Sequence, residues 1–344
     1  MFDGGVRWDE QAVRVDDGAL PGLARVGFVR SVRAPEFEGI TFHEVLCKSA
    51  LNKVPAASAL PFRFTVNGYR GCTHACRYCF ARPTHEYLDF DPGVDFDRQI
   101  VVKTNVVEVL RRELRRPSWT HETVALGTNT DPYQRAEGRY ALMPGIIGAL
   151  ADSYTPFSVL TKGTLLRRDL GLIAEAARRV EVSVAVSLAI GDADLHRDIE
   201  PGTPSPQARL ALISAIRDAG LSCHVMVAPV LPYLTDSAEH LDDLLGRIAE
   251  AGATSVTAFG LHLRGSTRGW FMSWLASSHP ELVWKYRQLY RKGAYLPAEY
   301  RHMLHDRVQP LIVKHGLAGQ PRMPAPETPT PQVARPEPEQ AALF

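Results

Sequence analysis

The sequence predicts an α/β protein, a partial (β/α)6 TIM-like barrel with parallel strands, an N-terminal extension and a C-terminal helical cap. Short, nearly continuous apolar segments alternate about six times with helical segments over roughly 200 residues, which is typical of a parallel sheet. The 344 residues are 45% hydrophobic and 22% charged, close to the average for globular proteins. This composition excludes a mainly disordered, collagen-like or disulfide-stapled chain.

Apolar patterns and turn residues predict the individual elements. The first 60 residues have weak periodicity, with one helix-compatible segment over 42–54. Asn105 or Thr104 can cap the helix predicted at 103–116, and Gly220 is placed to end the helix at 205–220. Strands are predicted at 61–66, 122–128, 157–162, 182–188, 222–230 and 254–260. Further helices are predicted at 144–153, 165–179 and 240–252.

Composition divides the chain into four regions. Residues 1–60 form the extension, and residues 61–262 form the barrel core. Residues 263–319 form a helical region rich in aromatic and basic side chains. Residues 320–344 are Pro-rich, so we expect a disordered or polyproline II tail there.

The overall charge and the cysteine content limit the class of protein. Lys and Arg total 39 against 38 Asp and Glu, so whole-chain charge does not argue for a nucleic-acid partner. No apolar stretch approaches the ~20 residues of a membrane span, and the N-terminus lacks the apolar core of a signal peptide. We therefore expect a cytoplasmic protein with no membrane partner. Five cysteines, an odd number, argue against a disulfide framework.

Three of the cysteines, Cys72, Cys76 and Cys79, lie within eight residues in GCTHACRYCFARP. Three soft ligands on one loop can hold a single metal centre, whereas structural zinc and ordinary iron–sulfur clusters use four protein ligands. The loop therefore leaves one coordination position for another molecule. The alternatives are a zinc site closed by His74 or His85, or reactive thiols that bind no metal.

The spacing Cys-x3-Cys-x-aromatic-Cys resembles the signature of the radical S-adenosylmethionine enzymes. The segment NGYRGCTHACRYCFARPTHEYL, followed by GTNTDPYQ, EPGTPSPQAR and APVLP, is similar to the spore photoproduct lyase-like branch of that superfamily, which includes many uncharacterised bacterial proteins. The resemblance covers roughly residues 40–300.

The resemblance implies that Cys72, Cys76 and Cys79 bind three irons of a [4Fe–4S] cluster, whose fourth iron is chelated by S-adenosylmethionine. An electron from a donor such as a flavodoxin or ferredoxin would cleave the cofactor, and the 5′-deoxyadenosyl radical would abstract hydrogen from a substrate, possibly a nucleic acid. Lyases of this branch use a hydrogen-donating cysteine near the end of the second strand. GTNT has none here, which argues against repair of DNA photoproducts.

The resemblance and the strand ends together suggest further cofactor contacts. Tyr78 would lie beside the adenine, or it packs in the loop. Asp131, with the oxygens of Thr128, Asn129 and Thr130, would bind the methionine ammonium, or the segment is only a turn. Other candidates at the same edge have capping or surface roles as alternatives; they are Ser187, Arg209 with its rival Arg197, and Lys162. Cys223 is expected in the core.

The C-terminal block carries nine Lys or Arg residues between Arg264 and Lys314 against three Asp or Glu, interleaved with aromatics. Such a pattern suits single-stranded or damaged nucleic acid, through stacking and phosphate contacts. It also suits a helical cap that covers the open barrel with its aromatics; we favour the cap, and the two roles can coexist. A second functional hypothesis follows: a zinc- or iron–sulfur-containing nucleic-acid-binding protein without turnover.

Overall fold

The computed structural model describes residues 14–16, 23, 27–55, 58 and 60–319. The Pro-rich tail at 320–344 and most of the first 26 residues lie outside the described residues, so the predictions for them stay predictions. None of the described helices is long and apolar enough to pass through a bilayer.

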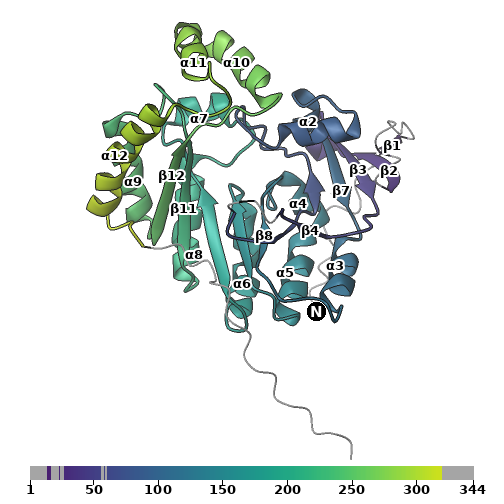
Figure 1. The fold of residues 1–344 in the computed structure, drawn as a ribbon. Coiled ribbons are helices and arrows are strands. Elements are labelled where there is room, and N and C mark those ends of the chain that lie inside the picture. The colour runs from purple at the N-terminus through teal and green to yellow at the C-terminus, as the bar shows by residue number, and fades with distance from the viewer. Residues whose placement is uncertain (1–13, 17–22, 24–26, 56–57, 59, 320–344) are drawn as a thin grey trace, which may run out of the picture.

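The main sheet has the strand order β12-β11-β10-β9-β8-β5-β4 (Figure 1). Every neighbouring pair from β5 to β12 is parallel, and β4 pairs antiparallel with β5 at the edge. The strands are β4 (Leu51–Lys53), β5 (Phe64–Val66), β8 (Val124–Leu126), β9 (Phe157–Thr161), β10 (Val182–Ser187), β11 (Cys223–Val230) and β12 (Ser255–Gly260). The predicted α/β class with a parallel sheet is confirmed.

Helices that follow these strands pack against the sheet and against one another. Buried aliphatic side chains from strands and helices form one large core, which includes Val124, Phe157, Val184 and Cys223. The core position predicted for Cys223 is confirmed. These helices are α3 (Val106–Leu114), α4 (Arg135–Tyr140), α5 (Leu142–Asp152), α6 (Leu170–Ala176), α7 (Ala193–Ile199), α8 (Pro206–Asp218) and α9 (Ala238–Glu250).

A second sheet combines the N-terminal residues with segments that flank the cysteine loop. Its order is β1-β2-β3-β7-β6, with β1 (Arg14–Asp16), β2 (Phe28–Arg33), β3 (Thr41–Val45), β6 (Tyr69–Arg70) and β7 (Gln99–Lys103). The helix expected over 42–54 is wrong, because this segment contributes β3 and β4. All five side chains of β3 are buried, and the strand has a hydrogen-bonding neighbour on each side, β2 and β7.

The helix expected over 103–116 begins only at Val106, because Gln99–Lys103 is strand β7. The Asn105 side chain does not cap this helix. Its Oδ1 accepts from the Cys47 amide at 2.8 Å, and its Nδ2 donates to the Cys47 carbonyl at 3.2 Å. Asn105 therefore joins the helix start to the segment between β3 and β4.

The C-terminal region is helical, and part of it covers the end of the barrel. Figure 1 shows α10 and α11 beyond the strands, near α7, while α12 lies against α9 and β12. Phe271, Trp274, Tyr286 and Tyr290 are buried in a cluster that also contains Cys76. The helices are α10 (Thr267–Ser278), α11 (Val283–Leu289) and α12 (Ala298–Lys314). These four aromatics favour the helical cap.

The remaining elements are short. Helix α2 covers Val94–Arg98, and the 3-10 helices are η1 (Pro35–Phe37), η2 (Arg82–Leu88), η3 (Thr164–Asp169) and η4 (Pro280–Leu282). The 3-10 helix η2 follows the cysteine loop, and α2 follows η2. Phe96 of α2 packs beside the loop in a cluster with Cys72 and Ala81.

Candidate active site

The cysteine loop begins where β6 ends. Gly71 has a φ of +83°, a conformation that favours glycine, and the Cys72 amide donates to the Phe96 carbonyl at 3.0 Å. Cys72 and Cys76 are buried and Cys79 is half-buried. Burial raises the pKa of all three thiols, and the Asp131 carboxylate and the other two thiols raise that of Cys72 further. The three thiols thus share one poorly solvated loop.

The three soft thiols of this loop fit an iron–sulfur centre. His74 Nδ1 lies 3.3 Å from Asp131 Oδ2, and His85 Nε2 donates to the Gln99 carbonyl at 2.9 Å, but each imidazole has a second ring nitrogen, and His85 Nδ1 is buried without a hydrogen-bond partner among the described residues. A zinc site closed by either histidine therefore stays the alternative. Within the described ranges, no three His, Cys, Asp or Glu side chains converge as a metal site. Metal binding by Cys72, Cys76 and Cys79 therefore stays a prediction, supported by the type of ligand.

The TNTDPYQ segment after β8 holds the cysteine loop in place. Thr130 Oγ1 donates to the Gly71 carbonyl at 2.6 Å, and Gln134 Nε2 donates to the same carbonyl at 3.1 Å. Gln134 Oε1 accepts from the Thr73 amide at 2.9 Å. The segment is therefore more than a surface turn, because its polar side chains replace water around the backbone of the loop.

Thr128 and Asn129 contact Asn67, the residue that follows β5. Thr128 Oγ1 and the Asn129 amide lie 3.3 and 3.2 Å from Asn67 Oδ1. Both candidates therefore lie at the edge of the sheet where β5 and β8 end. Their predicted contact with the methionine ammonium is not tested by these bonds.

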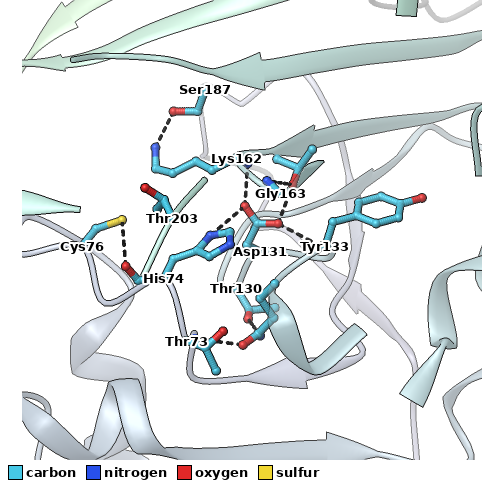
Figure 2. A network of polar contacts seen from close by, with 12 residues as sticks. Thr73, His74, Cys76, Thr130, Asp131, Tyr133, Lys162, Gly163, Ser187 and Thr203 are labelled. Atoms are coloured by element: carbon cyan, nitrogen blue, oxygen red, sulfur yellow. Dashed lines mark hydrogen bonds and ion pairs between the residues drawn. The ribbon is translucent and has the colours of Figure 1, made fainter. Parts of the chain in front are cut away.

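Asp131 is surrounded by donors from three segments (Figure 2). It accepts from Thr161 Oγ1 at 2.5 Å, from the Lys162 amide at 2.7 Å and from the Tyr133 amide at 2.9 Å, and it faces His74. Burial alone would raise its pKa, but His74 and these hydrogen bonds outweigh burial and lower the pKa. Asp131 is therefore an ionised anchor between the end of β9 and the cysteine loop.

A second buried carboxylate, Glu200, brings four of the predicted residues together. Tyr78 donates its hydroxyl to Glu200, and Arg209 Nη2 donates to Glu200 Oε2 at 2.6 Å. Lys162 Nζ lies 3.5 Å from Glu200 Oε1 and donates to Ser187 Oγ at 2.5 Å. Arg209 Nη1 also donates to the Ser187 carbonyl at 2.9 Å.

The electrostatics of this group explain why Glu200 is charged although it is fully buried. Burial would raise its pKa, but Arg209 and Lys162 outweigh that effect and hold the pKa far below its usual range. Sequence reasoning missed Glu200 as a site residue, although it opens the EPGTPSPQAR segment. Arg197, the alternative to Arg209, does not join this group. It is exposed and pairs with Asp194 on the surface of α7.

The segment that carries Glu200 lies directly against the cysteine loop. The Gly202 amide donates to the His74 carbonyl at 3.1 Å, and the Arg77 amide donates to the Ile199 carbonyl at 2.9 Å. A Cβ on Gly202 would lie 2.1 Å from the Thr73 carbonyl oxygen. Glycine is therefore required at position 202 by this close backbone approach.

Arg82 fixes the other side of the cysteine loop and was also missed from the sequence. Its Nε and Nη2 donate to the Cys76 carbonyl at 3.2 and 3.0 Å, and Nη2 pairs with Asp97 at 2.9 Å. The guanidinium is fully buried between the rings of Phe96 and Trp270, at 5.2 and 4.8 Å from their centroids. Trp270 comes from α10, so the cap reaches the loop through this cation.

With this geometry established, comparison with known proteins identifies the class. The chain belongs to the radical SAM superfamily, where SAM is S-adenosylmethionine; the model of that family matches residues 66–245. Membership implies an enzyme that uses a [4Fe–4S] cluster and S-adenosylmethionine. The resemblance predicted from the cysteine spacing is confirmed.

Particular relatives place the chain further. Uncharacterized proteins of Mycobacterium bovis and Mycobacterium tuberculosis are each 76% identical to it, over 98% of this chain and 100% of their own. An uncharacterized protein of Methanocaldococcus jannaschii is 25% identical over 56% of this chain and 69% of its own.

Solved structures of spore photoproduct lyase share the fold. The lyase complexed with dinucleoside spore photoproduct has a TM-score of 0.60 at 16% identity, over 80% of this chain and 79% of that one. A lyase variant with bound AdoMet and the same dinucleoside has a TM-score of 0.60 at 14% identity, with the same coverage.

We predict that Gly202→Ala disrupts the seating of the cysteine loop. Because the added Cβ meets backbone, we expect a loss of about 1–3 kcal/mol in the free energy of unfolding and a lower iron content after anaerobic reconstitution. Urea unfolding and iron analysis measure the two effects. The control is Gly148→Ala in α5, where an added Cβ has nothing within 4 Å. Wild-type stability and iron content in Gly202→Ala would contradict the prediction.

We also predict that Glu200→Gln lowers the free energy of unfolding by about 3 kcal/mol, because it leaves Arg209 and Lys162 without a counter-charge in a buried place. Chemical denaturation compares it with Glu175→Gln, which removes an exposed pair with Arg178 and should cost less than about 1 kcal/mol. Equal losses of unfolding free energy in the two variants would contradict the prediction, because the buried ion pairs of Glu200 would then stabilise the fold no more than an exposed pair does.

Proposed function

We propose that this chain generates a 5′-deoxyadenosyl radical from S-adenosylmethionine and uses it to abstract hydrogen from a substrate. Cys72, Cys76 and Cys79 would hold the [4Fe–4S] cluster, which supplies the electron for cleavage of the cofactor when both are bound. The observation that carries the proposal is the three-thiol loop, with Cys72 and Cys76 buried and Cys79 half-buried, held against the ends of parallel strands in a chain of this superfamily. The six parallel strands from β5 to β12 support a partial (β/α)6 barrel as its scaffold.

The charge around Glu200 supports a binding site for the methionine carboxylate. Lys162 and Arg209 together carry two positive charges against the single negative charge of Glu200. A surplus positive charge at a poorly solvated strand edge favours an anionic group. Ser187 Oγ adds a hydroxyl beside Lys162 Nζ. Within this proposal, Arg209 acts by holding Glu200 and the end of β10, and Lys162 and Ser187 face the ligand.

The other contacts proposed with S-adenosylmethionine lie around this group. Tyr78 would place its ring against the adenine, and the Lys162 ammonium already lies 5.7 Å from the centre of that ring. Thr128, Asn129 and Asp131 would face the methionine ammonium from the end of β8. Since the Asp131 oxygens already accept from protein donors, its part would be to supply negative charge more than a new hydrogen bond.

An external one-electron donor such as a flavodoxin or ferredoxin belongs to this proposal. The sequence has a single clustered set of cysteines, since Cys47 and Cys223 stand alone, so it offers no second three- or four-cysteine motif that would relay electrons to the first.

A nucleic acid is the proposed substrate class, supported by aromatic and basic side chains at the end of β12 and after it. Phe259 is 41% exposed and stacks on His262, with 5.6 Å between ring centroids. Tyr295 is 48% exposed and meets His262 edge-on at 4.8 Å, and Arg264 covers the Tyr295 ring at 4.9 Å. Exposed rings beside a cation are the groups on which bases stack. Leu261 and Leu263, which alternate with these residues, pack in the same cluster as Cys76 and Tyr78.

The decisive test is cofactor cleavage. Anaerobically reconstituted protein should contain iron and acid-labile sulfide, and with dithionite and S-adenosylmethionine it should release 5′-deoxyadenosine, measured by liquid chromatography. Cys76→Ala should lose both the cluster and the product, while Cys223→Ala in the core should keep both. Protein that binds only zinc under these conditions would refute the proposal.

The second candidate, a metal-containing nucleic-acid-binding protein without turnover, rests on the same exposed rings. Both candidates predict that a single-stranded oligonucleotide binds with strong salt dependence, followed by fluorescence anisotropy. Tyr295→Ala should weaken binding at least about fivefold, since stacking is worth about 1–3 kcal/mol per base. Tyr154→Ala, exposed before β9 at the opposite end of the sheet, is the control. Binding without release of 5′-deoxyadenosine would favour the second candidate, and equal binding by both variants would exclude the Tyr295 surface.

A further inference from the structure

A cavity of about 180 Å³ lies on the second sheet, away from the group around Glu200. Arg70 from β6 and Lys103 from β7 line it, together with Lys48 from the segment after β3. We call it the Arg70 cavity. Figure 1 shows β3 and β7 next to each other in this part of the molecule, at the purple and blue end of the colour scale.

The alternation of β6 and β7 places the cavity on the outer face of this sheet. Tyr69 points into the main core, where it donates to Glu137 at 2.5 Å, so its neighbour Arg70 points to the opposite face. Val101 on β7 likewise belongs to a separate apolar cluster with Val45 and Leu88, whereas Ile100 and Val102 belong to the main core.

The positive charge in the Arg70 cavity has no counter-charge among the described residues. Its described lining contains three basic side chains and no carboxylate. Neither Arg70 nor Lys103 donates a side-chain hydrogen bond or forms an ion pair within the part of the chain that the structure describes, although both are half-buried. Elsewhere the buried cations Arg82 and Arg209 each have a carboxylate partner.

The physical consequence is a pair of cations, Arg70 and Lys103, that are partly shielded from solvent and repel each other. Burial lowers the pKa of Arg70, and burial together with Arg70 lowers that of Lys103. Burial raises the pKa of the Cys47 thiol on the cavity wall, so this thiol stays neutral and adds no negative charge near pH 7. Half-buried charges without partners are costly, and an anion in the cavity would remove that cost.

We propose that the Arg70 cavity binds a phosphate group. Three cations suit a dianion, and the guanidinium fork of Arg70 can donate to two oxygens of a tetrahedral oxyanion at once. The volume equals that of about six water molecules, so it also admits a short part of an ester beside the phosphate, against Val45 and Leu88. The site is independent of cofactor cleavage and shares no lining residue with the Tyr295 surface.

The test measures whether phosphate occupies this cavity in the full-length chain. Inorganic phosphate, adenosine monophosphate and a short single-stranded oligonucleotide are titrated separately at constant ionic strength. One readout is isothermal titration calorimetry, and the other is the rate of Cys47 alkylation by iodoacetamide, followed on the Cys47 peptide by mass spectrometry. We expect binding to slow this alkylation, because Cys47 lines the cavity.

Arg70→Gln and Lys103→Met should each weaken phosphate binding at least about tenfold, the usual effect of losing one charge-assisted contact. Lys53→Met, an exposed lysine on β4, is the matched control and should bind as the wild type does. Should Arg70→Gln fail to fold, Arg70→Lys keeps the charge but loses the fork and should bind measurably more weakly.

The outcomes show which kind of molecule carries the phosphate and whether the proposal stands. Binding of inorganic phosphate and the mononucleotide assigns a small ligand, and binding of the oligonucleotide alone assigns a backbone phosphate; both support the site. No protection of Cys47 by any of the three, or unchanged affinity in Arg70→Gln and Lys103→Met, overturns it. Neither readout depends on 5′-deoxyadenosine release, so failure here leaves the radical chemistry standing.

Discussion

The buried charge of Glu200 is the interaction on which the arrangement of the site depends. A fully buried carboxylate persists only beside positive partners, and its two partners come from different strand–helix units: Lys162 follows β9, while Arg209 lies in α8 and also holds the end of β10. Through the Tyr78 hydroxyl the same carboxylate reaches the cysteine loop. One ionic group therefore sets the position of the loop relative to two strand ends.

The loop itself is held mainly by its backbone, which leaves the sulfur atoms for another task. Arg82 binds the Cys76 carbonyl, Thr267 Oγ1 donates to the Cys79 carbonyl at 3.1 Å, and the Gly202 amide binds the His74 carbonyl. Among the described residues these three thiols form no strong hydrogen bond; the contact from Cys76 Sγ to the His74 carbonyl is 4.0 Å long. These contacts fix the backbone of the loop and not the positions of its sulfur atoms.

Local patterns predicted the parallel core and, because strand ends in such folds lie at one edge, Lys162 and Ser187; Tyr78 and Arg209 came in with the family resemblance. The local patterns gave the wrong element where pairing with distant strands determines the secondary structure. Residues 42–54 have a helix-compatible pattern, yet β3 forms since β2 and β7 supply partners on both sides. Glu200 and Arg82 were missed because a charged residue is expected to be solvent-exposed when only the sequence is known. Only the fold reveals that Arg209 and Asp97 lie beside them.

The net charge of +1 gives no information about anion-binding sites, because charge is unevenly distributed over the structure. Acidic and basic residues cancel over the whole chain, but they do not cancel locally. Around Glu200 two cations face one carboxylate, and in the Arg70 cavity three cations face none among the described residues. Lys48 is exposed, but Arg70, Lys103 and Lys162 are half-buried and Arg209 is fully buried, so an anionic ligand gains more beside these four cations than at the open surface. The two sites are built on different sheets and share no residue, because the Arg70 cavity is lined from β3, β6 and β7, whereas the group around Glu200 lies at the ends of β9 and β10.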